Sequence, residues 1–226
     1  MVKNLLNIFF PELCLGCQSV LTDNEKHLCS GCRHQLPITN FHRERNNPVE
    51  RIFRGRVKLE RGTALLRFEK RGIVQQLLHN LKYRHREEIG LIFGRWMGEL
   101  LYDEKEFSTV DAVVPVPIHK NKLRRRGYNQ VTQFGKEVAR KLNAEYLDDV
   151  LLKSQPTRTK VFQKRLSRWT QDDGVFTLNH SDKLKNKHVL VVDDIITTGA
   201  TIEACSLTLN KESGIKISVA AIAIAE

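Results

Sequence analysis

The stretch VLVVDDIITTGAT, from Val189 to Thr201, decides the fold of this 226-residue chain. Four apolar residues of high β-propensity end in two adjacent carboxylates, and a loop rich in hydroxyl groups follows. This order predicts a buried strand, a turn, and then a helix that begins near Ala200. In open parallel sheets, ligands bind beyond the carboxyl ends of the strands. We therefore expect a ligand site at residues 193–201.

The loop suits a phosphate, and the two acids suit a sugar. The backbone N–H groups of the loop and the N-terminus of the next helix can surround a phosphate, and Gly199 permits a positive φ. Carboxylates cannot face a phosphate, but they can accept hydrogen bonds from ribose hydroxyls. The sequence therefore predicts a ribose 5-phosphate site. The candidate binding residues are Asp193, Asp194, Thr197, Thr198, Gly199, Ala200 and Thr201.

The alternation of strand and helix continues along the chain. Apolar runs alternate with segments whose apolar residues recur at helical spacing, which is typical of βαβ units. We therefore predict an α/β fold, with a parallel sheet and helices on both of its faces. The predicted strands are residues 61–68, 110–117, 146–152, 188–192 and 215–225. The predicted helices are residues 73–81, 89–101, 129–142 and 200–214, the last ending at Gly214.

Four of the five cysteines form two C-x-x-C pairs that are separated by eleven residues. Four thiolates so arranged suit tetrahedral Zn²⁺, and metal binding supplies folding free energy to a module with little core. A redox dithiol is the alternative, but two matched pairs favour zinc and a reducing cytoplasm. We expect His27 and His34 at the surface and Cys205 buried in a helix. The predicted zinc ligands are Cys14, Cys17, Cys29 and Cys32.

The net charge of +11 is concentrated in two segments. Residues 33–86 and residues 119–170 each hold 14 Lys and Arg against 4 Asp and Glu, and the remainder is acidic. A solvated surface is one interpretation, and a polyanionic partner, nucleic acid first, is the other. The run Arg124, Arg125 and Arg126 can bind phosphate oxygens of a small ligand or of a nucleic-acid backbone.

The stretch from Val189 to Thr201 resembles the phosphoribosyl pyrophosphate motif of type I phosphoribosyltransferases. Every defining position is filled: four apolar residues, two acids, two apolar residues and Thr-Thr-Gly-x-Thr. The resemblance implies a type I phosphoribosyltransferase-like sheet with a hood, and phosphoribosyl pyrophosphate held with Mg²⁺. It also implies that the loop after an earlier strand holds the pyrophosphate. The candidates in that loop are His119, Lys120 and Lys122.

A second stretch, PVPIHKNKLRRRGYNQ at residues 115–130, resembles the Arg-Gly-aromatic-Asn-Gln signature of ComF-type competence proteins. The cysteine module, the helical stretch LLHNLKYRH at residues 77–85, this loop and the phosphoribosyl motif occur in the order of the ComF family over nearly the whole chain. One departure is Gln171-Asp172-Asp173, where the family has an Asn-containing step. The resemblance implies a cytoplasmic protein of natural transformation that handles incoming single-stranded DNA.

Two functions remain open from the sequence. In the first, the chain binds single-stranded DNA and phosphoribosyl pyrophosphate during DNA uptake. In the second, it transfers phosphoribosyl to a nitrogen acceptor, with Asp193 or Asp194 as candidates to stabilise charge on the ribose. A zinc-module scaffold with a relic site is less favoured, because the loop is complete. The sequence does not identify the acceptor, the oligomeric state or protein partners such as other competence or DNA-processing proteins.

The candidate nucleic-acid contacts combine cations with aromatic residues. They are Arg124, Arg125, Arg126 and Tyr128. Tyr83 and Trp169 also lie among Lys and Arg and could stack on bases, although packing in the fold is the simpler role of each of these aromatic residues.

We expect three parts along the chain. Residues 1–36 are the predicted zinc-binding module, residues 37–72 a basic connecting or hood segment, and residues 73–226 the phosphoribosyltransferase-like domain. No apolar run approaches the roughly 18 residues of a membrane span, and the N-terminal stretch lacks the small-residue cleavage site of a signal peptide.

Overall fold

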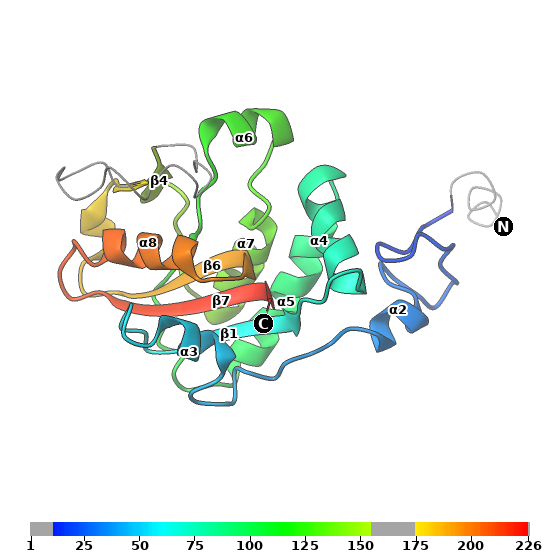
Figure 1. Cartoon of the computed structure of the whole chain (residues 1–226), viewed down its shortest axis with the longest axis horizontal. Coiled ribbons are helices and arrows are strands. Elements are labelled where there is room, and N and C mark those ends of the chain that lie inside the picture. The colour runs from blue at the N-terminus through cyan, green and yellow to red at the C-terminus, as the bar shows by residue number, and fades with distance from the viewer. Residues whose placement is uncertain (1–10, 155–174, 226) are drawn as a thin grey trace.

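The computed structural model describes residues 11–154 and 175–225, so the segment with Trp169 and residues 171–173 lies outside the described residues (Figure 1). Its centre is a five-stranded parallel sheet with the strand order β1-β7-β6-β2-β3. The α/β prediction is confirmed. The strands are β1 (Gly62–Arg67), β2 (Ala112–Pro115), β3 (Glu145–Tyr146), β6 (His188–Ile196) and β7 (Lys216–Ile224).

Helices cover both faces of this sheet, and each face has its own core. On one face, Leu190 and Val192 of β6 pack with helices α4 (Ile73–Tyr83), α5 (Glu88–Tyr102) and α7 (Thr132–Leu142). On the other face, Val189 and Val191 pack with helices α3 (Pro48–Phe53) and α8 (Ala200–Leu209). The strand is therefore buried on both sides, which explains why its sequence is continuously apolar rather than alternating.

Helix α5 lies very close to α7 because three glycines, Gly90, Gly94 and Gly98, face α7 at intervals of four residues. A Cβ atom at Gly94 would lie 2.6 Å from the carbonyl oxygen of Phe134 and 2.9 Å from the Cβ of Glu137. The glycines therefore permit a backbone contact that fixes α7 on the sheet, and with it the residues that precede α7.

Three local predictions were wrong. Residues 146–152 do not form one strand: the chain leaves the main sheet after β3, and β4 (Leu151–Lys153) pairs with β5 (Phe176–Leu178) in a separate antiparallel sheet. Helix α8 ends at Leu209, and Gly214, with φ +73°, lies in the turn before β7 instead. The basic segment after β2 is not a loop but helix α6 (Lys120–Arg126).

Helix α6 forms despite its like charges because both of its ends are capped. The ring of His119 accepts a hydrogen bond from the backbone N–H of Asn121 at 3.2 Å. Gly127 ends the helix in the left-handed conformation, with φ +82°, which a residue without Cβ adopts at no steric cost.

The cysteine module packs directly on α4. Cys14, Leu15 and Cys32 share a core with the buried face of this helix. The buried side chain of Asn80 donates a hydrogen bond to the carbonyl of Leu15 at 2.9 Å. As predicted, Cys205 is buried in α8, and His27 and His34 are exposed.

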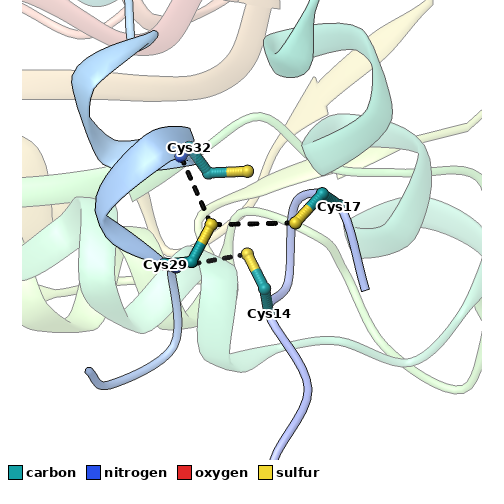
Figure 2. A group of neighbouring side chains, drawn as sticks. All are labelled: Cys14, Cys17, Cys29 and Cys32. Carbon is teal, nitrogen blue, oxygen red and sulfur yellow. Dashed lines mark hydrogen bonds between the residues drawn. The ribbon is translucent and has the colours of Figure 1, made fainter. Parts of the chain in front are cut away.

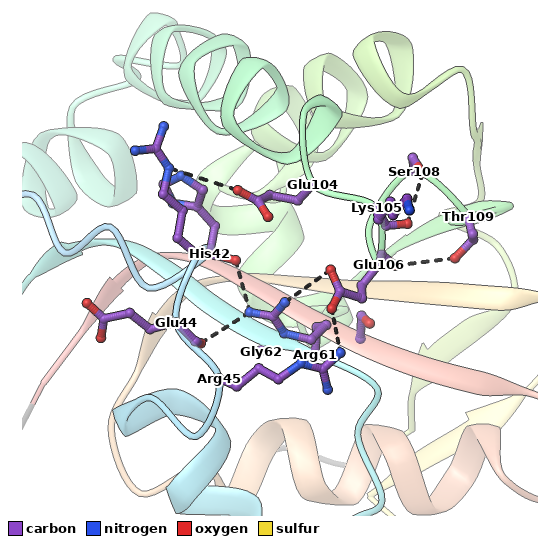
Figure 3. A network of polar contacts seen from close by, with 12 residues as sticks. His42, Glu44, Arg45, Arg61, Gly62, Glu104, Lys105, Glu106, Ser108 and Thr109 are labelled. Carbon is purple, nitrogen blue, oxygen red and sulfur yellow. Dashed lines mark hydrogen bonds and ion pairs between the residues drawn. The ribbon is translucent and has the colours of Figure 1, made fainter.

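A buried arginine connects the segment before β1 to the sheet (Figure 3). Arg61 pairs with Glu50 at 2.9 Å and Glu106 at 3.4 Å, and its guanidinium donates to the carbonyls of His42 and Glu44. The charge and its donors are thus satisfied inside the protein, as burial requires. Strand β1 follows at once, so part of the predicted connecting segment is an edge strand of the main sheet.

Candidate ligand site and zinc centre

The two acids of the motif lie inside β6 rather than after it, because this strand extends to Ile196. Asp193 and Asp194 are only 7% and 4% exposed. Successive side chains of a strand point to opposite faces of its sheet, and the contacts of the two carboxylates differ accordingly.

Asp194 faces α4, where the ammonium of Lys82 forms an ion pair with its carboxylate. On the same side, the amide of Gln130 lies 3.5 Å from the other carboxylate oxygen. The guanidinium of Arg126, the last residue of α6, donates in turn to Gln130. A chain of polar contacts therefore leads from the basic helix to the acid pair.

Asp193 lies on the side of the phosphate-type loop. Burial raises the pKa of Asp193, and the neighbouring charge of Asp194 raises this pKa further. One Asp193 oxygen accepts the backbone N–H of Asp194 at 2.8 Å. The residue also lines a cavity of about 30 Å³ together with the loop that follows β6, which is room for about one water molecule.

The loop has the geometry that the sequence predicts. Gly199 has φ +74° and precedes the first residue of α8. A Cβ atom there would lie 2.6 Å from the Cγ2 of Ile52 and 2.9 Å from the Cε1 of Phe53, so side chains of α3 pack directly against the loop. Thr197, Thr198 and Thr201 are exposed.

Arg56 also fixes the loop, and sequence reasoning missed it. Its guanidinium donates to the carbonyl of Thr198 at 2.8 Å and pairs with Glu203 of α8. Lys82 was missed as well. Both residues lie more than 100 positions from their partners in the chain, and no local pattern of the sequence signals such contacts.

The basic candidate residues after β2 differ in their positions and contacts. Lys120 lines a cavity of about 410 Å³ at the carboxyl end of β2, together with Lys153 of β4. His119 caps α6, while Lys122, Arg124 and Arg125 are exposed. Only Arg126 is connected to the acid pair, through Gln130.

Tyr128 is held in the fold. Its hydroxyl donates to the carbonyl of Leu81, and burial raises the pKa of this tyrosine. Its ring lies beside that of His85, with centroids 5.7 Å apart.

The Lys82–Asp194 pair supplies a prediction about stability. We expect Lys82→Met to lower the free energy of unfolding by about 3 kcal/mol, because it leaves a buried carboxylate without its counter-ion. Asp194→Asn in the same chain removes that charge, so the double variant should lose less than the two single variants combined, by about 0.5–3 kcal/mol. Urea unfolding of the four proteins measures the difference. Strictly additive losses would mean that the pair contributes nothing.

The four cysteine side chains meet in one cluster (Figure 2). Their sulfur atoms all lie within 4.8 Å of one another, and those of Cys17 and Cys29 are 3.7 Å apart. Tetrahedral zinc with Zn–S bonds of about 2.3 Å requires sulfur atoms about 3.8 Å apart. The donor set therefore fits structural zinc.

Hydrogen bonds to sulfur also position these thiols. The backbone N–H of Cys29 donates to the sulfur of Cys14 at 3.3 Å, and that of Cys32 to the sulfur of Cys29 at 3.4 Å. Cys29 is also the N-cap of helix α2 (Ser30–His34). Hydrogen bonds from Ser19 lower the pKa of Cys17 to about 6, which favours the thiolate that a metal requires.

Comparison with known families agrees with both parts of the molecule. Residues 5–42 match the double zinc ribbon domain, and residues 132–224 match the phosphoribosyl transferase domain. Among the described residues, no helix has both the length and the apolar character needed to cross a bilayer.

Two curated relatives match nearly end to end. The DNA utilization protein YhgH of Escherichia coli (strain K12) is 25% identical over 210 residues, which are 92% of this chain and 88% of that protein. Competence protein F of Haemophilus influenzae is 24% identical over 217 residues, 90% of this chain and 93% of that protein. Among solved structures, adenine phosphoribosyltransferase of Saccharomyces cerevisiae is 14% identical and aligns with a TM-score of 0.39 over 66% of this chain and 73% of that one.

Proposed function

We propose that this chain, a ComF-type protein with a double zinc ribbon and a phosphoribosyl transferase domain, binds phosphoribosyl pyrophosphate and single-stranded DNA in competence-related DNA handling. The observation that carries the proposal is the loop at Gly199, which opens onto α8 directly beside a buried acid pair. The cytoplasm is the proposed compartment, because all five cysteines are free thiols, and free thiols persist in a reducing environment.

Phosphoribosyl pyrophosphate suits this loop for physical reasons. Its 5-phosphate would accept hydrogen bonds from the N–H groups of residues 197–201 at the positive end of α8. Its ribose hydroxyls would donate to Asp193 and Asp194. Mg²⁺ suits carboxylate and phosphate oxygens and would accompany the pyrophosphate. Lys120, which lines the cavity at the end of β2, and Arg126, which contacts Gln130, are candidate cations for the pyrophosphate.

Single-stranded DNA is the proposed macromolecular partner. Arg124 and Arg125 are exposed on α6, and the described residues supply no ion pair for either of them. Exposed cations on a helix can neutralise backbone phosphates without regard to sequence. Other competence or DNA-processing proteins are the proposed protein partners.

The roles of the three α6 arginines can be separated. We expect Arg124→Ala with Arg125→Ala to flatten the slope of log DNA affinity against log salt by about 0.7 for each lost phosphate contact, and to leave phosphoribosyl pyrophosphate affinity unchanged. Arg126→Ala should lower the affinity for phosphoribosyl pyrophosphate, because it removes the hydrogen bond that positions Gln130. Fluorescence anisotropy across a salt series and calorimetry with the ligand measure the two quantities. An unchanged salt slope for the Arg124–Arg125 double variant would show that α6 is not part of the DNA-binding surface.

The cavity of about 410 Å³ beside Lys120 favours a second candidate function, because it offers room for an acceptor. In a transfer reaction, the bond between ribose C1 and the pyrophosphate oxygen breaks while a bond from an acceptor nitrogen forms, and the pyrophosphate leaves with the bonding pair. Asp193 or Asp194 would stabilise positive charge on the ribose. Pyrophosphate release with nucleobases or ammonia would establish this activity. Ligand binding without pyrophosphate release would support the binding function only.

A further inference from the structure

The C-terminal end of α4 carries aromatic and cationic side chains that the ligand site does not use. His79, Tyr83, Arg84, His85 and Arg86 are all exposed. Tyr83 is 60% exposed, which is unusual for so large a ring at the end of a helix whose other face is buried. Packing in the hydrophobic core therefore does not explain why an aromatic residue occupies this position.

The ring of Tyr83 is nevertheless held in place by two neighbours, and Arg126 lies over one of its faces. The guanidinium carbon of Arg126 lies 5.4 Å from the ring centroid. The ring of His79 lies one turn earlier on α4, with the two centroids 5.1 Å apart and the planes tilted by 45°. Tyr83 is thus an exposed ring of fixed position, whereas the hydroxyl of Tyr128 is hydrogen-bonded within the fold.

A cleft with basic residues in its lining lies at the same end of α4 as this ring. A cavity of about 320 Å³ lies between the last turn of α4 and the cysteine module. Arg84, His85, Arg86 and Glu88 line it together with Leu13 and Gln18. Arg86 lies 3.3 Å from Glu88, but no ion pair with Arg84 exists in the described part of the chain. Positive charge is stable here because the carbonyl end of α4 points to it.

We propose that the end of α4 and this cleft form a binding surface for single-stranded DNA, with a base stacked on Tyr83 and backbone phosphates at Arg84 and Arg86. An exposed aromatic ring beside a cationic groove is the combination that binds single strands without sequence preference. In Figure 1, α4 stands between α6 and the cysteine module, so a strand crossing α4 extends from one to the other. The proposal rests on the proposed DNA-binding function and assigns it a location.

The test uses the full chain with zinc bound and a labelled single-stranded oligonucleotide. Tyr83→Ala is expected to weaken binding about five- to 150-fold, the range measured for loss of one stacking contact. Tyr83→Phe keeps the ring and should bind as the wild type does. Arg84→Ala with Arg86→Ala should flatten the salt slope by about 1.4, for two phosphates.

The chain offers matched controls. Tyr102 is 57% exposed beside Lys141, at the end of α5, so Tyr102→Ala removes an equally exposed ring elsewhere. Arg95→Ala with Arg140→Ala removes two exposed arginines that share Glu137, and so changes the net charge equally. Both controls should bind DNA more tightly than the α4 variants.

The outcomes distinguish the location of the DNA surface from the DNA-binding function itself. If the wild type binds the oligonucleotide and the α4 variants match their controls, the α4 surface is wrong while the DNA-binding function stands. If the wild type does not bind, the proposed DNA-binding function fails first. Zinc content and thermal unfolding equal to those of the wild type show that a weakened variant is folded, and Tyr83→Phe with restored affinity assigns the loss to the ring. An equally strong loss with duplex DNA would contradict stacking.

Discussion

Cys29→Ser is expected to release zinc and to unfold the cysteine module, residues 11–36. This is the largest effect that the structure predicts, because structural zinc contributes about 10–16 kcal/mol to the folding of such modules. Cys29 supplies one thiol of the cluster, caps α2 and accepts the N–H of Cys32. Elemental analysis would report the loss of metal, and hydrogen exchange would report the loss of protected amides in the module.

Cys205→Ala is the control for this experiment. It removes a thiol that is buried in α8 and takes no part in the cluster, so it should retain zinc. In Cys29→Ser, the loss of amide protection should extend to Asn80 of α4, because its side chain then has no Leu15 carbonyl to bind. Native protein that is purified without zinc, yet has a protected module, would refute a structural role for the metal.

Asp193→Ala with Asp194→Ala is expected to give the second largest effect, on the affinity for phosphoribosyl pyrophosphate. Each lost hydrogen bond between a carboxylate and a ribose hydroxyl should cost about 1.5–3 kcal/mol. Removing negative charge near an anionic ligand acts in the opposite direction, so a measured loss cannot arise from net charge. Calorimetry with Mg²⁺ and the ligand measures the change.

Asp103→Ala with Glu104→Ala provides the matched control, because these adjacent acids lie at the end of α5 and carry the same charge. The control should bind the ligand at least as well as the wild type. Equal affinity in the wild type and the Asp193–Asp194 double variant would place the ligand elsewhere on the molecule.

The features that follow from short-range patterns were predictable from the sequence. The strand at β6, the positive φ of Gly199 and the cysteine cluster each depend on a few neighbouring residues. The sequence could not reveal that α6 is a helix, because its seven residues are mostly like-charged and depend on the caps at His119 and Gly127.

Other features depend on contacts between distant parts of the chain. Lys82 meets Asp194, and Arg56 meets the loop at Thr198, only after the sheet has assembled. The same holds for the separation of β3 from β4, because the alternative pairing of β4 with β5 decides it. Patterns within a window of the sequence carry no information on such pairings.

Helix α4 joins three parts of the molecule within four consecutive residues. Asn80 holds the cysteine module, Lys82 holds Asp194, and Tyr83 meets Arg126. A helix moves as one body, so a ligand that displaces the Lys82 ammonium also acts on the other two contacts. By thermodynamic reciprocity, any factor by which such a ligand changes DNA affinity equals the factor by which DNA changes the affinity for the ligand. We therefore expect the proposed binding of phosphoribosyl pyrophosphate and the proposed binding of single-stranded DNA to be coupled through α4.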